Sequence, residues 1–265
     1  VMRRALEYAN YHGLTVISHC EDPALSSEGH VNEGYVSTKI GLQGIPAQSE
    51  EIMVYRDISL CRLTGTPVHI AHVSTSESVE LIKRAKDMGL PVTAETAPHY
   101  FILDHRATEG YDTNTKMNPP LRSAEDVEAV RRALRDDIID VIATDHAPHS
   151  PLEKEVEFDQ AAFGIIGLQT ALPLTMKLVI SGYITLPHAI RKMSINPARI
   201  LGIPGGRIME GEPADLAIID PYYEYILKKE EILSKSKNTP FLNRLMTGIC
   251  LMTIVGGRIV WKREV

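Results

Sequence analysis

The sequence predicts an α/β fold built on a parallel sheet, followed by a small β domain. Three observations support this prediction. Short apolar runs alternate with helical patterns, several of those runs end in a potential metal ligand, and glycine-punctuated strands replace the alternation after about residue 205. Alternation of strands and helices is typical of parallel sheets, open or closed into a barrel. We therefore expect one domain over residues 1–204 and a second over 205–265.

Composition and charge exclude several classes of protein. Of the 265 residues, 44% are hydrophobic and 23% are charged, which is typical of a globular chain and excludes extensive disorder. A net charge of −6 provides no basic surface for nucleic acid. No apolar run reaches the roughly 18 residues that a membrane span needs. The 3 cysteines lie far apart without a CxxC motif, which is typical of reduced thiols in a cytoplasmic protein.

Four runs are predicted to be strands that helices bury on both faces. Each run is short and rich in β-branched or small residues, as the interior of a parallel sheet requires. The runs are LTVIS (14–18), PVHIA (67–71), PVTAETA (91–97) and DVIAT (140–144).

Helical patterns separate these runs and have recognisable ends. The patterns at 76–89 and 123–137 start with serine before acidic residues, and those at 49–65 and 76–89 close on glycine. Serine is a good N-cap, acidic side chains favour the positive end of the helix dipole, and glycine tolerates the left-handed conformation that ends helices. The chain opens inside a further amphipathic pattern that Gly13 ends. We therefore expect that an upstream segment is missing from this sequence.

The last part of the chain is predicted to be an antiparallel β domain. Residues 206–221 and 251–265 contain short strands broken by glycines, and IVGGRIV (254–260) is typical of a hairpin. The polar stretch 228–244 is expected to be a connecting loop. These features predict a small β-sandwich-like domain over 205–265.

Residues that can carry chemistry stand at the ends of the predicted strands. His19, His72 and Asp145 each end a run, and His99 follows another within two residues. Parallel α/β proteins bind ligands at the carboxyl ends of their strands, and imidazole with carboxylate suits zinc and related divalent ions. A single strand-end histidine is more often a hydrogen-bonded structural residue. Several in successive strands indicate a metal centre.

Other residues near these ends have two interpretations each. His146 could orient Asp145 or be structural, and Glu21 with Asp22 could orient His19 or be solvated loop acids. Sequence alone does not separate these alternatives.

Three further positions are candidates for binding substrate. His149 lies in a proline-containing turn just past the last strand, from which it could reach a ligand. The loop TKMNPPLRS (115–123) is stiffened by two prolines and presents Asn118, which suits an amide, and Arg122, which suits a carboxylate or a local salt bridge. Backbone groups beside Gly164 could touch substrate, although close packing would equally explain a glycine there.

A series of motifs spread over nearly the whole chain resembles the class I dihydroorotases of the amidohydrolase superfamily. In order, they are HCED, HIAHVST, AETAPHYF, NTKMNPPLRS, IATDHAPHS, FGIIGLQTALPL, NPARILGI and GEPADLAIIDP. The motifs NPPLR and FGIIGLQTALPL favour dihydroorotases over hydantoinases and allantoinases. The resemblance implies a metal-dependent-hydrolase TIM barrel, of which this chain would supply about the fifth to eighth strands with their helices, and a small C-terminal β domain.

The resemblance also implies roles for particular residues. His19, His72 and Asp145 would bind zinc, two ions being present in a complete site, and Asp145 would transfer the catalytic proton. Substrate would contact four residues, namely Asn118, His149, Phe163 and Gly164. The implied reaction is the reversible zinc-dependent conversion of (S)-dihydroorotate to N-carbamoyl-L-aspartate in pyrimidine biosynthesis.

The chain departs from the family's pattern in its metal ligands. None of its 10 histidines forms the His-x-His pair of the family's first strand, and the family's fourth strand, with its bridging carboxylate, has no counterpart. We therefore expect the C-terminal portion of a dihydroorotase whose partner is the missing N-terminal half of the barrel. Residues 1–265 alone are predicted to be inactive.

Two alternatives stay open on the sequence. A hydantoinase- or allantoinase-like cyclic amidase would use a similar site, and a non-catalytic dihydroorotase-like subunit would scaffold aspartate transcarbamoylase. The resemblance implies a cytoplasmic enzyme with a small-molecule substrate, assembled as a homo-oligomer or with aspartate transcarbamoylase. No nucleic-acid or membrane partner is expected.

Overall fold

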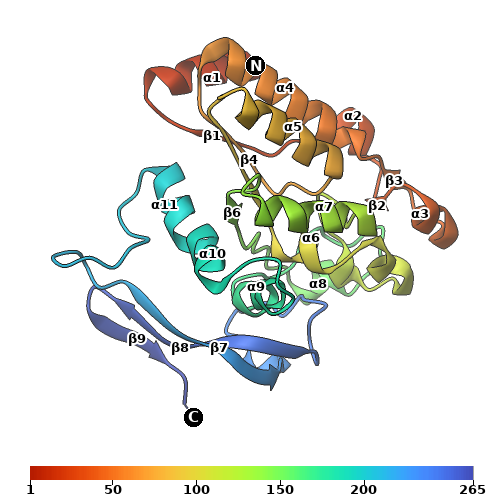
Figure 1. Ribbon diagram of the computed structural model, residues 1–265. Coiled ribbons are helices and arrows are strands. Elements are labelled where there is room, and N and C mark those ends of the chain that lie inside the picture. The colour runs from red at the N-terminus through yellow and green to blue at the C-terminus, as the bar shows by residue number, and fades with distance from the viewer. Residues whose placement is uncertain (265) are drawn as a thin grey trace.

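Four short strands form a parallel sheet (Figure 1). The computed structural model describes residues 1–264, and in it the strands pair in the order β1, β4, β5, β6. Each strand coincides with one of the predicted runs, so the prediction of a parallel sheet is confirmed. The strands are β1 (Val16–Ser18), β4 (Val68–Ile70), β5 (Val92–Thr96) and β6 (Val141–Ile142).

Long helices cover the sheet, and their ends follow local capping rules. The helices that match the predicted patterns are α1 (Met2–Tyr11), α4 (Gln48–Thr64), α5 (Ser76–Asp87) and α7 (Ala124–Arg135). α7 starts with a capping box between Ser123 and Asp126, as the sequence indicates. At α5 the cap is Thr75 and not Ser76, because the Thr75 hydroxyl accepts a hydrogen bond from the backbone N–H of Ser78 at 3.1 Å.

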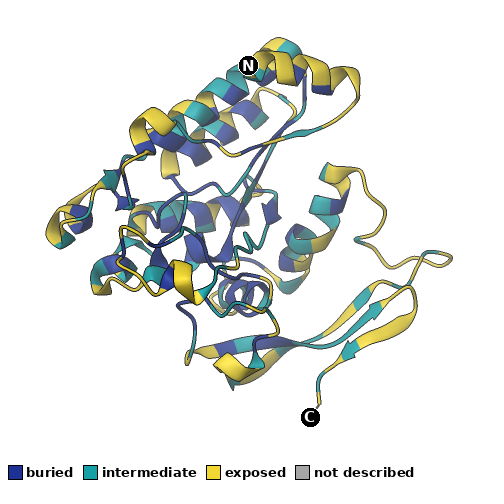
Figure 2. Cartoon of the chain, turned by 180° about the vertical axis from the view of Figure 1, so that it is seen from behind, coloured by how far each residue is buried: buried dark blue, intermediate teal, exposed yellow. Residues whose placement is uncertain are grey.

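The main core lies between these helices and the sheet. Leu6 of α1, Val54 of α4, Ile82 of α5 and Val130 of α7 are buried in one apolar cluster with Ile70 of β4. Each such side chain stabilises the fold by roughly 1.5–3 kcal/mol relative to an exposed position. Figure 2 shows the same division from behind, with buried strands and inner helix faces and exposed outer helix faces.

Shorter elements occupy the segments that follow β1, β5 and β6. They lie at the carboxyl edge of the sheet, where parallel α/β proteins bind ligands. A short parallel pair, β2 with β3, belongs to the segment between β1 and α4. The elements are α2 (Pro23–Ser26), β2 (Val31–Asn32), α3 (Tyr35–Ile40), β3 (Gly44–Ile45), α6 (Pro98–Ile102), η1 (His105–Gly110), η2 (Thr113–Thr115) and α8 (Pro151–Lys154).

After the sheet, the chain forms helices and then an antiparallel sheet in the order β7, β8, β9. Gly256 and Gly257, with φ of 54° and 76°, make the two-residue turn of the predicted hairpin, which is confirmed. The strand expected within 206–221 begins only at Leu216. The elements are α9 (Ala171–Ile180), α10 (Leu186–Ile190), η3 (Arg191–Ile195), α11 (Asn196–Leu201), β7 (Leu216–Ile226), η4 (Lys229–Glu231), β8 (Leu245–Val255) and β9 (Arg258–Lys262).

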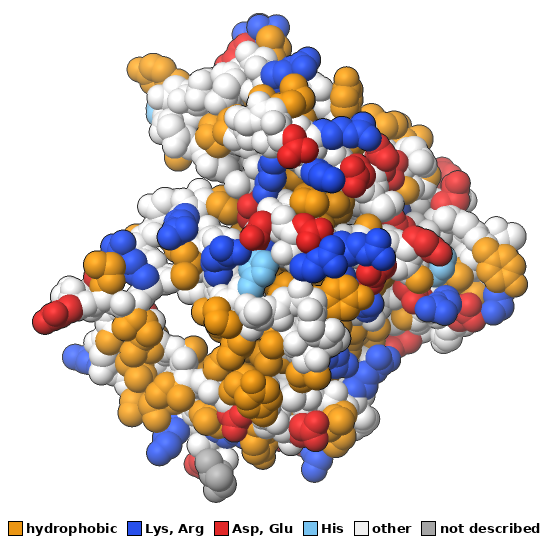
Figure 3. Space-filling view, in the orientation of Figure 1, with side chains coloured by type: hydrophobic (Ala, Val, Ile, Leu, Met, Phe, Trp, Pro, Cys, Tyr) orange, Lys and Arg blue, Asp and Glu red, His pale blue; other side chains and the backbone are white. Residues whose placement is uncertain are grey.

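The antiparallel sheet is anchored to the rest of the chain at one end. Leu227, Phe241 and Met246 join a second buried apolar cluster with Tyr100 of α6 and Leu174 of α9. In contrast, β9 has no buried residue, and Figure 3 shows exposed hydrophobic side chains over this part of the molecule. The domain boundary near residue 205 and the sandwich-like arrangement stay predictions.

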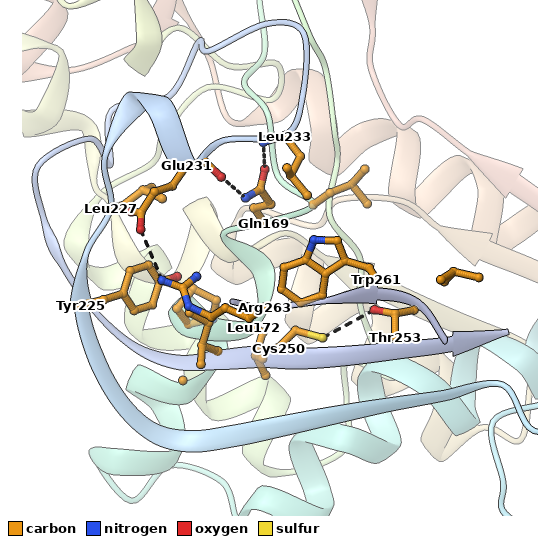
Figure 4. Close-up of a pocket in the computed structure, with 15 residues that line it drawn as sticks. Gln169, Leu172, Tyr225, Leu227, Glu231, Leu233, Cys250, Thr253, Trp261 and Arg263 are labelled. Atoms are coloured by element: carbon orange, nitrogen blue, oxygen red, sulfur yellow. Dashed lines mark hydrogen bonds and ion pairs between the residues drawn. The ribbon is translucent and has the colours of Figure 1, made fainter. Parts of the chain in front are cut away.

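A pocket with a volume of about 400 Å³ lies between α9 and the antiparallel sheet (Figure 4). Leu172, Tyr225 and Trp261 supply much of its apolar lining, and Gln169 donates a hydrogen bond to the backbone oxygen of Glu231 at 2.9 Å. None of its lining residues is a predicted site residue.

Among residues 1–264, no helix is long and apolar enough to cross a membrane.

Candidate active site

His19 and His72 lie together at the carboxyl edge of the parallel sheet. β1 and β4 are neighbouring strands, and each histidine follows its strand within two residues. His19 Nδ1 is 2.7 Å from His72 Nε2, with the rings edge to face at a centroid distance of 4.7 Å. His72 has a φ of 37°, a strained conformation for a bulky side chain. The fold therefore aims two imidazole nitrogens from separate strands at one point.

Asp145 stands at the same edge, beyond β6. Its Oδ2 is 3.7 Å from Nε2 of His99, which lies in the first turn of α6. Burial lowers the pKa of His99 to about 3, so its ring is neutral. Burial raises the pKa of Asp145, an effect that the nearby His72 opposes. Asp145 also has a positive φ, of 45°.

Two imidazole nitrogens at this edge are buried without a hydrogen-bond partner in the described part of the chain. They are Nδ1 of His72 and Nε2 of His99. A buried polar atom without a partner carries a desolvation cost of about 1–3 kcal/mol. Such atoms beside a carboxylate are what a cation-binding edge presents before its ligand is in place.

The donor types at this edge fit zinc, but the set does not close around an ion. Two imidazoles and one carboxylate, from His19, His72 and Asp145, are ordinary zinc ligands. Within residues 1–264, no three His, Cys, Asp or Glu side chains are placed so that together they could hold a metal ion. The chain thus places donors of the zinc-binding type along one edge of the sheet, and their role as metal ligands stays a prediction.

Glu21 links His19, one of the predicted metal ligands, to Asn118, one of the predicted substrate residues. Its Oε2 is 2.7 Å from Nε2 of His19 and accepts a hydrogen bond from Nδ2 of Asn118 at 3.2 Å. Burial would raise the pKa of Glu21, but hydrogen bonds from His19, Ser26 and Asn118 outweigh it and hold this pKa below its usual range. The ionised carboxylate orients His19, which agrees with one of the two interpretations of Glu21. Asp22 instead caps α2 through the backbone N–H of Ala24 at 3.0 Å.

His146 and Arg122 both form hydrogen bonds to groups within the protein. Nδ1 of His146 accepts hydrogen bonds from the backbone N–H groups of Gly167 at 3.0 Å and Leu168 at 3.4 Å, so this nitrogen is not free to orient Asp145. Arg122 is 2% exposed and forms a local network, which is the salt-bridge alternative of the sequence analysis.

Two of the other predicted substrate residues, His149 and Gly164, lie close together in the loops after β6. A Cβ placed on Gly164 would lie 2.6 Å from Cβ of Ala147 and 3.7 Å from Nε2 of His149, so Gly164 is packed closely on the loop after β6. Phe163 lies over the ammonium group of Lys116, 4.6 Å from the ring centre. The structure thus brings His149 and Gly164 together, although their roles in binding substrate stay predictions.

Asn238 is a residue of this region that sequence reasoning missed. It belongs to the polar stretch 228–244, which is a loop as predicted, yet its side chain is buried against His149 and Gly164. An asparagine within a polar loop has no sequence signal that separates a buried role from a solvated one.

Comparisons with known proteins show the family and the fold. The Amidohydrolase family matches residues 1–260. A dihydroorotase of Pelotomaculum thermopropionicum is 56% identical over 266 residues, and one of Geotalea daltonii is 53% identical over 264 residues. Each alignment covers 100% of this chain and 62% of the relative, so the chain spans less than two thirds of the length of these relatives.

Solved structures of the same architecture show the fold. An L-hydantoinase from Arthrobacter aurescens superposes with a TM-score of 0.90 at 25% identity, over 100% of this chain and 60% of that structure. A dihydropyrimidinase from Brevibacillus agri superposes with a TM-score of 0.88 at 23% identity, over 98% of this chain and 59% of that structure. The predicted fold class, part of a hydrolase barrel with a small β domain, is confirmed.

Proposed function

We propose that this chain, which belongs to the amidohydrolase family, forms part of a dihydroorotase that interconverts (S)-dihydroorotate and N-carbamoyl-L-aspartate. The observation that carries the proposal is the contact of Glu21 with both His19 and Asn118, which joins a metal-type histidine to an amide-recognising side chain. The relatives at 53–56% identity support this reading, since both carry the name dihydroorotase. Zinc dependence, a place in pyrimidine biosynthesis and a cytoplasmic location belong to the same proposal.

The residues of this chain would divide the work as follows. His19, His72 and Asp145 would hold zinc, which when bound supplies Lewis acidity for the ring carbonyl and lowers the pKa of water. Asp145 accepts the proton of the attacking water as the bond to the ring carbonyl carbon forms. It then gives that proton to the ring nitrogen as the C–N bond breaks. Because His99 is neutral, it adds no positive charge that would weaken Asp145 as a base.

The remaining residues bind and orient the substrate. Asn118 can both donate to and accept from a cyclic amide, and Glu21 fixes its position relative to His19. His149 and the backbone at Phe163–Gly164 form the opposite wall. Because all of these groups lie on loops at one edge of the sheet, their spacing depends on contacts between loops.

A comparison of substrates tests the proposal. The complete gene product, supplied with zinc, should hydrolyse dihydroorotate with a kcat/KM on the order of 10⁴-fold above that for hydantoin or allantoin, the difference expected when buried polar groups of a site are left unpaired. A preference for hydantoin or allantoin would contradict the proposal. So would an inert protein that binds aspartate transcarbamoylase tightly without zinc, which is the scaffold alternative.

The isolated chain provides a second test. Residues 1–265 contain His19, His72 and Asp145 but no His-x-His pair, so we propose that they do not hydrolyse dihydroorotate by themselves. A zinc-dependent rate from this chain comparable with that of the complete gene product would overturn this part of the proposal.

A further inference from the structure

Asn238 lies in a rigid part of an otherwise polar loop. It is 6% exposed, and the residues that follow it, Thr239 and Phe241, are 2% and 0% exposed. Phe241 packs in the apolar cluster that anchors the antiparallel sheet. The side chain of Asn238 is therefore presented from a fixed backbone.

The side-chain amide of Asn238 forms hydrogen bonds to two loops. One loop follows β6 and contains Ala147 and His149, and the other contains Gly164. Its Oδ1 accepts a hydrogen bond from the backbone N–H of His149 at 3.2 Å. Its Nδ2 donates to the backbone oxygens of Ala147 at 2.9 Å and Gly164 at 3.3 Å. The backbone oxygen of Asn238 also accepts from the N–H of Ile166 at 3.0 Å. Only a short primary amide can accept one such bond and donate two others from this position.

The two loops need such a connection because they share little regular structure. Beyond β6, they contact one another through the N–H of Ala147, which donates to the oxygen of Ile165 at 2.8 Å, and through an isolated bridge at His146. The ring of His146 adds the two hydrogen bonds from Gly167 and Leu168 described above. Loops held by few bonds sample several arrangements, and a displacement of about 1 Å near bound substrate can cost on the order of 100-fold in rate.

We propose that Asn238 is a positioning residue, which sets the spacing between His149 and Gly164 and so shapes the wall that receives the substrate. This inference rests on the proposed function, because it takes His149 and Gly164 as substrate contacts. The polar stretch 228–244 thereby acquires a part in the active site, although it is remote in sequence from the predicted metal ligands.

The test compares Asn238→Ala with Asn10→Ala in the complete gene product. Asn10 also donates one side-chain hydrogen bond to a backbone oxygen, that of Thr64 at 3.2 Å, but on the opposite edge of the sheet. N238A should raise KM for dihydroorotate by on the order of 10- to 100-fold with little change in kcat, because it loosens binding and leaves Asp145 in place. N10A should leave KM unchanged. A folded N238A with an unchanged KM would overturn the proposal.

Two further measurements keep the outcome decisive. If N238A does not fold, Asn238→Ser, whose hydroxyl can still donate to one carbonyl, replaces it, and its KM decides in the same way. Hydrogen exchange of the backbone amides gives a second readout, which is measured without substrate. In N238A, or in N238S where that variant replaces it, the amide of His149 and the amides of residues 163–167 should exchange faster, with other regions unaffected.

Unchanged exchange at these amides would overturn the role of Asn238 whatever the activity. If the unmodified protein does not turn over dihydroorotate, the proposed function fails, and the exchange data still decide whether Asn238 positions the two loops.

Discussion

Two regions of this molecule contain buried charged and polar groups. The regions differ in how many of these groups have a hydrogen-bond partner. One is the carboxyl edge of the parallel sheet around His72 and Asp145. The other, here called the Arg122 cluster, consists of Arg122, Glu50, Ser74 and Asn32. At the sheet edge, imidazole nitrogens are left without partners in the described residues, and two residues have strained positive φ values.

In the Arg122 cluster, nearly every group has a partner. Arg122 donates to Oδ1 of Asn32 at 2.9 Å and to Oγ of Ser74 at 3.0 Å. Glu50 accepts from the backbone N–H groups of Ser74 at 3.0 Å and Thr75 at 3.3 Å, and lies 3.5 Å from Nη2 of Arg122. In the Arg122 cluster only Nη2 of Arg122 has no hydrogen-bond partner among the described residues, and it lies near the Glu50 carboxylate. At the sheet edge the buried nitrogens of two imidazoles are left without partners within residues 1–264.

The largest expected effect is on chemistry at the sheet edge. Asp145→Asn should lower kcat of the complete gene product by on the order of 10²- to 10⁴-fold, because an amide cannot accept and return the catalytic proton. Without zinc, its thermal stability should not fall, since burial already disfavours the charge at this position. Steady-state kinetics and a thermal melt measure both. Asp136→Asn, on the exposed end of α7, is the control, and full activity in D145N would contradict the assignment.

The next effect is on stability and belongs to the Arg122 cluster. Arg122→Met should lower the free energy of unfolding by about 3–5 kcal/mol, because it leaves Glu50 as an unpaired buried charge. Urea unfolding at a fixed zinc concentration measures this loss. The double variant R122M/E50Q should lose less than the two single variants combined. A loss below about 0.5 kcal/mol in R122M would show that the cluster does not depend on the pair.

A smaller effect distinguishes two neighbouring acids at the sheet edge. Glu21→Gln should weaken zinc binding or activity by about 10- to 100-fold, because the carboxylate that orients His19 is lost. Competition with a zinc chelator measures the affinity. Asp22→Asn is the matched control, since asparagine caps a helix as well as aspartate does. Equal losses in the two variants would indicate a general effect of charge.

The smallest effect concerns an exposed pair, as a counterpart to the buried one. Lys39 and Glu109 lie 2.7 Å apart with side chains that are 49% and 35% exposed. Lys39→Met should change the free energy of unfolding by less than about 1 kcal/mol, because solvent screens the pair. Urea unfolding at low and high salt measures this. A loss as large as that of R122M would remove the distinction between the two kinds of pair.

Much of the fold follows from local sequence patterns. The apolar runs that end in His19, His72 and Asp145 indicate both the strands and the edge of the sheet at which these residues stand. The pair Gly256–Gly257 indicates the hairpin, because both positions require positive φ. The cap of α5 could not be assigned to Thr75 with certainty, because Thr75 and Ser76 are both good capping residues.

Sequence by itself determined the order of the elements, the residue types that stand at the strand ends and the family. These depend on spacing along the chain and on residue chemistry, which are local properties. Only the tertiary structure decided which polar residues meet. Glu21 contacts Asn118 across 97 positions, and Asn238 contacts His149 across 89. Such contacts depend on how loops from distant segments converge on one sheet edge, and no pattern within a single loop specifies its partner.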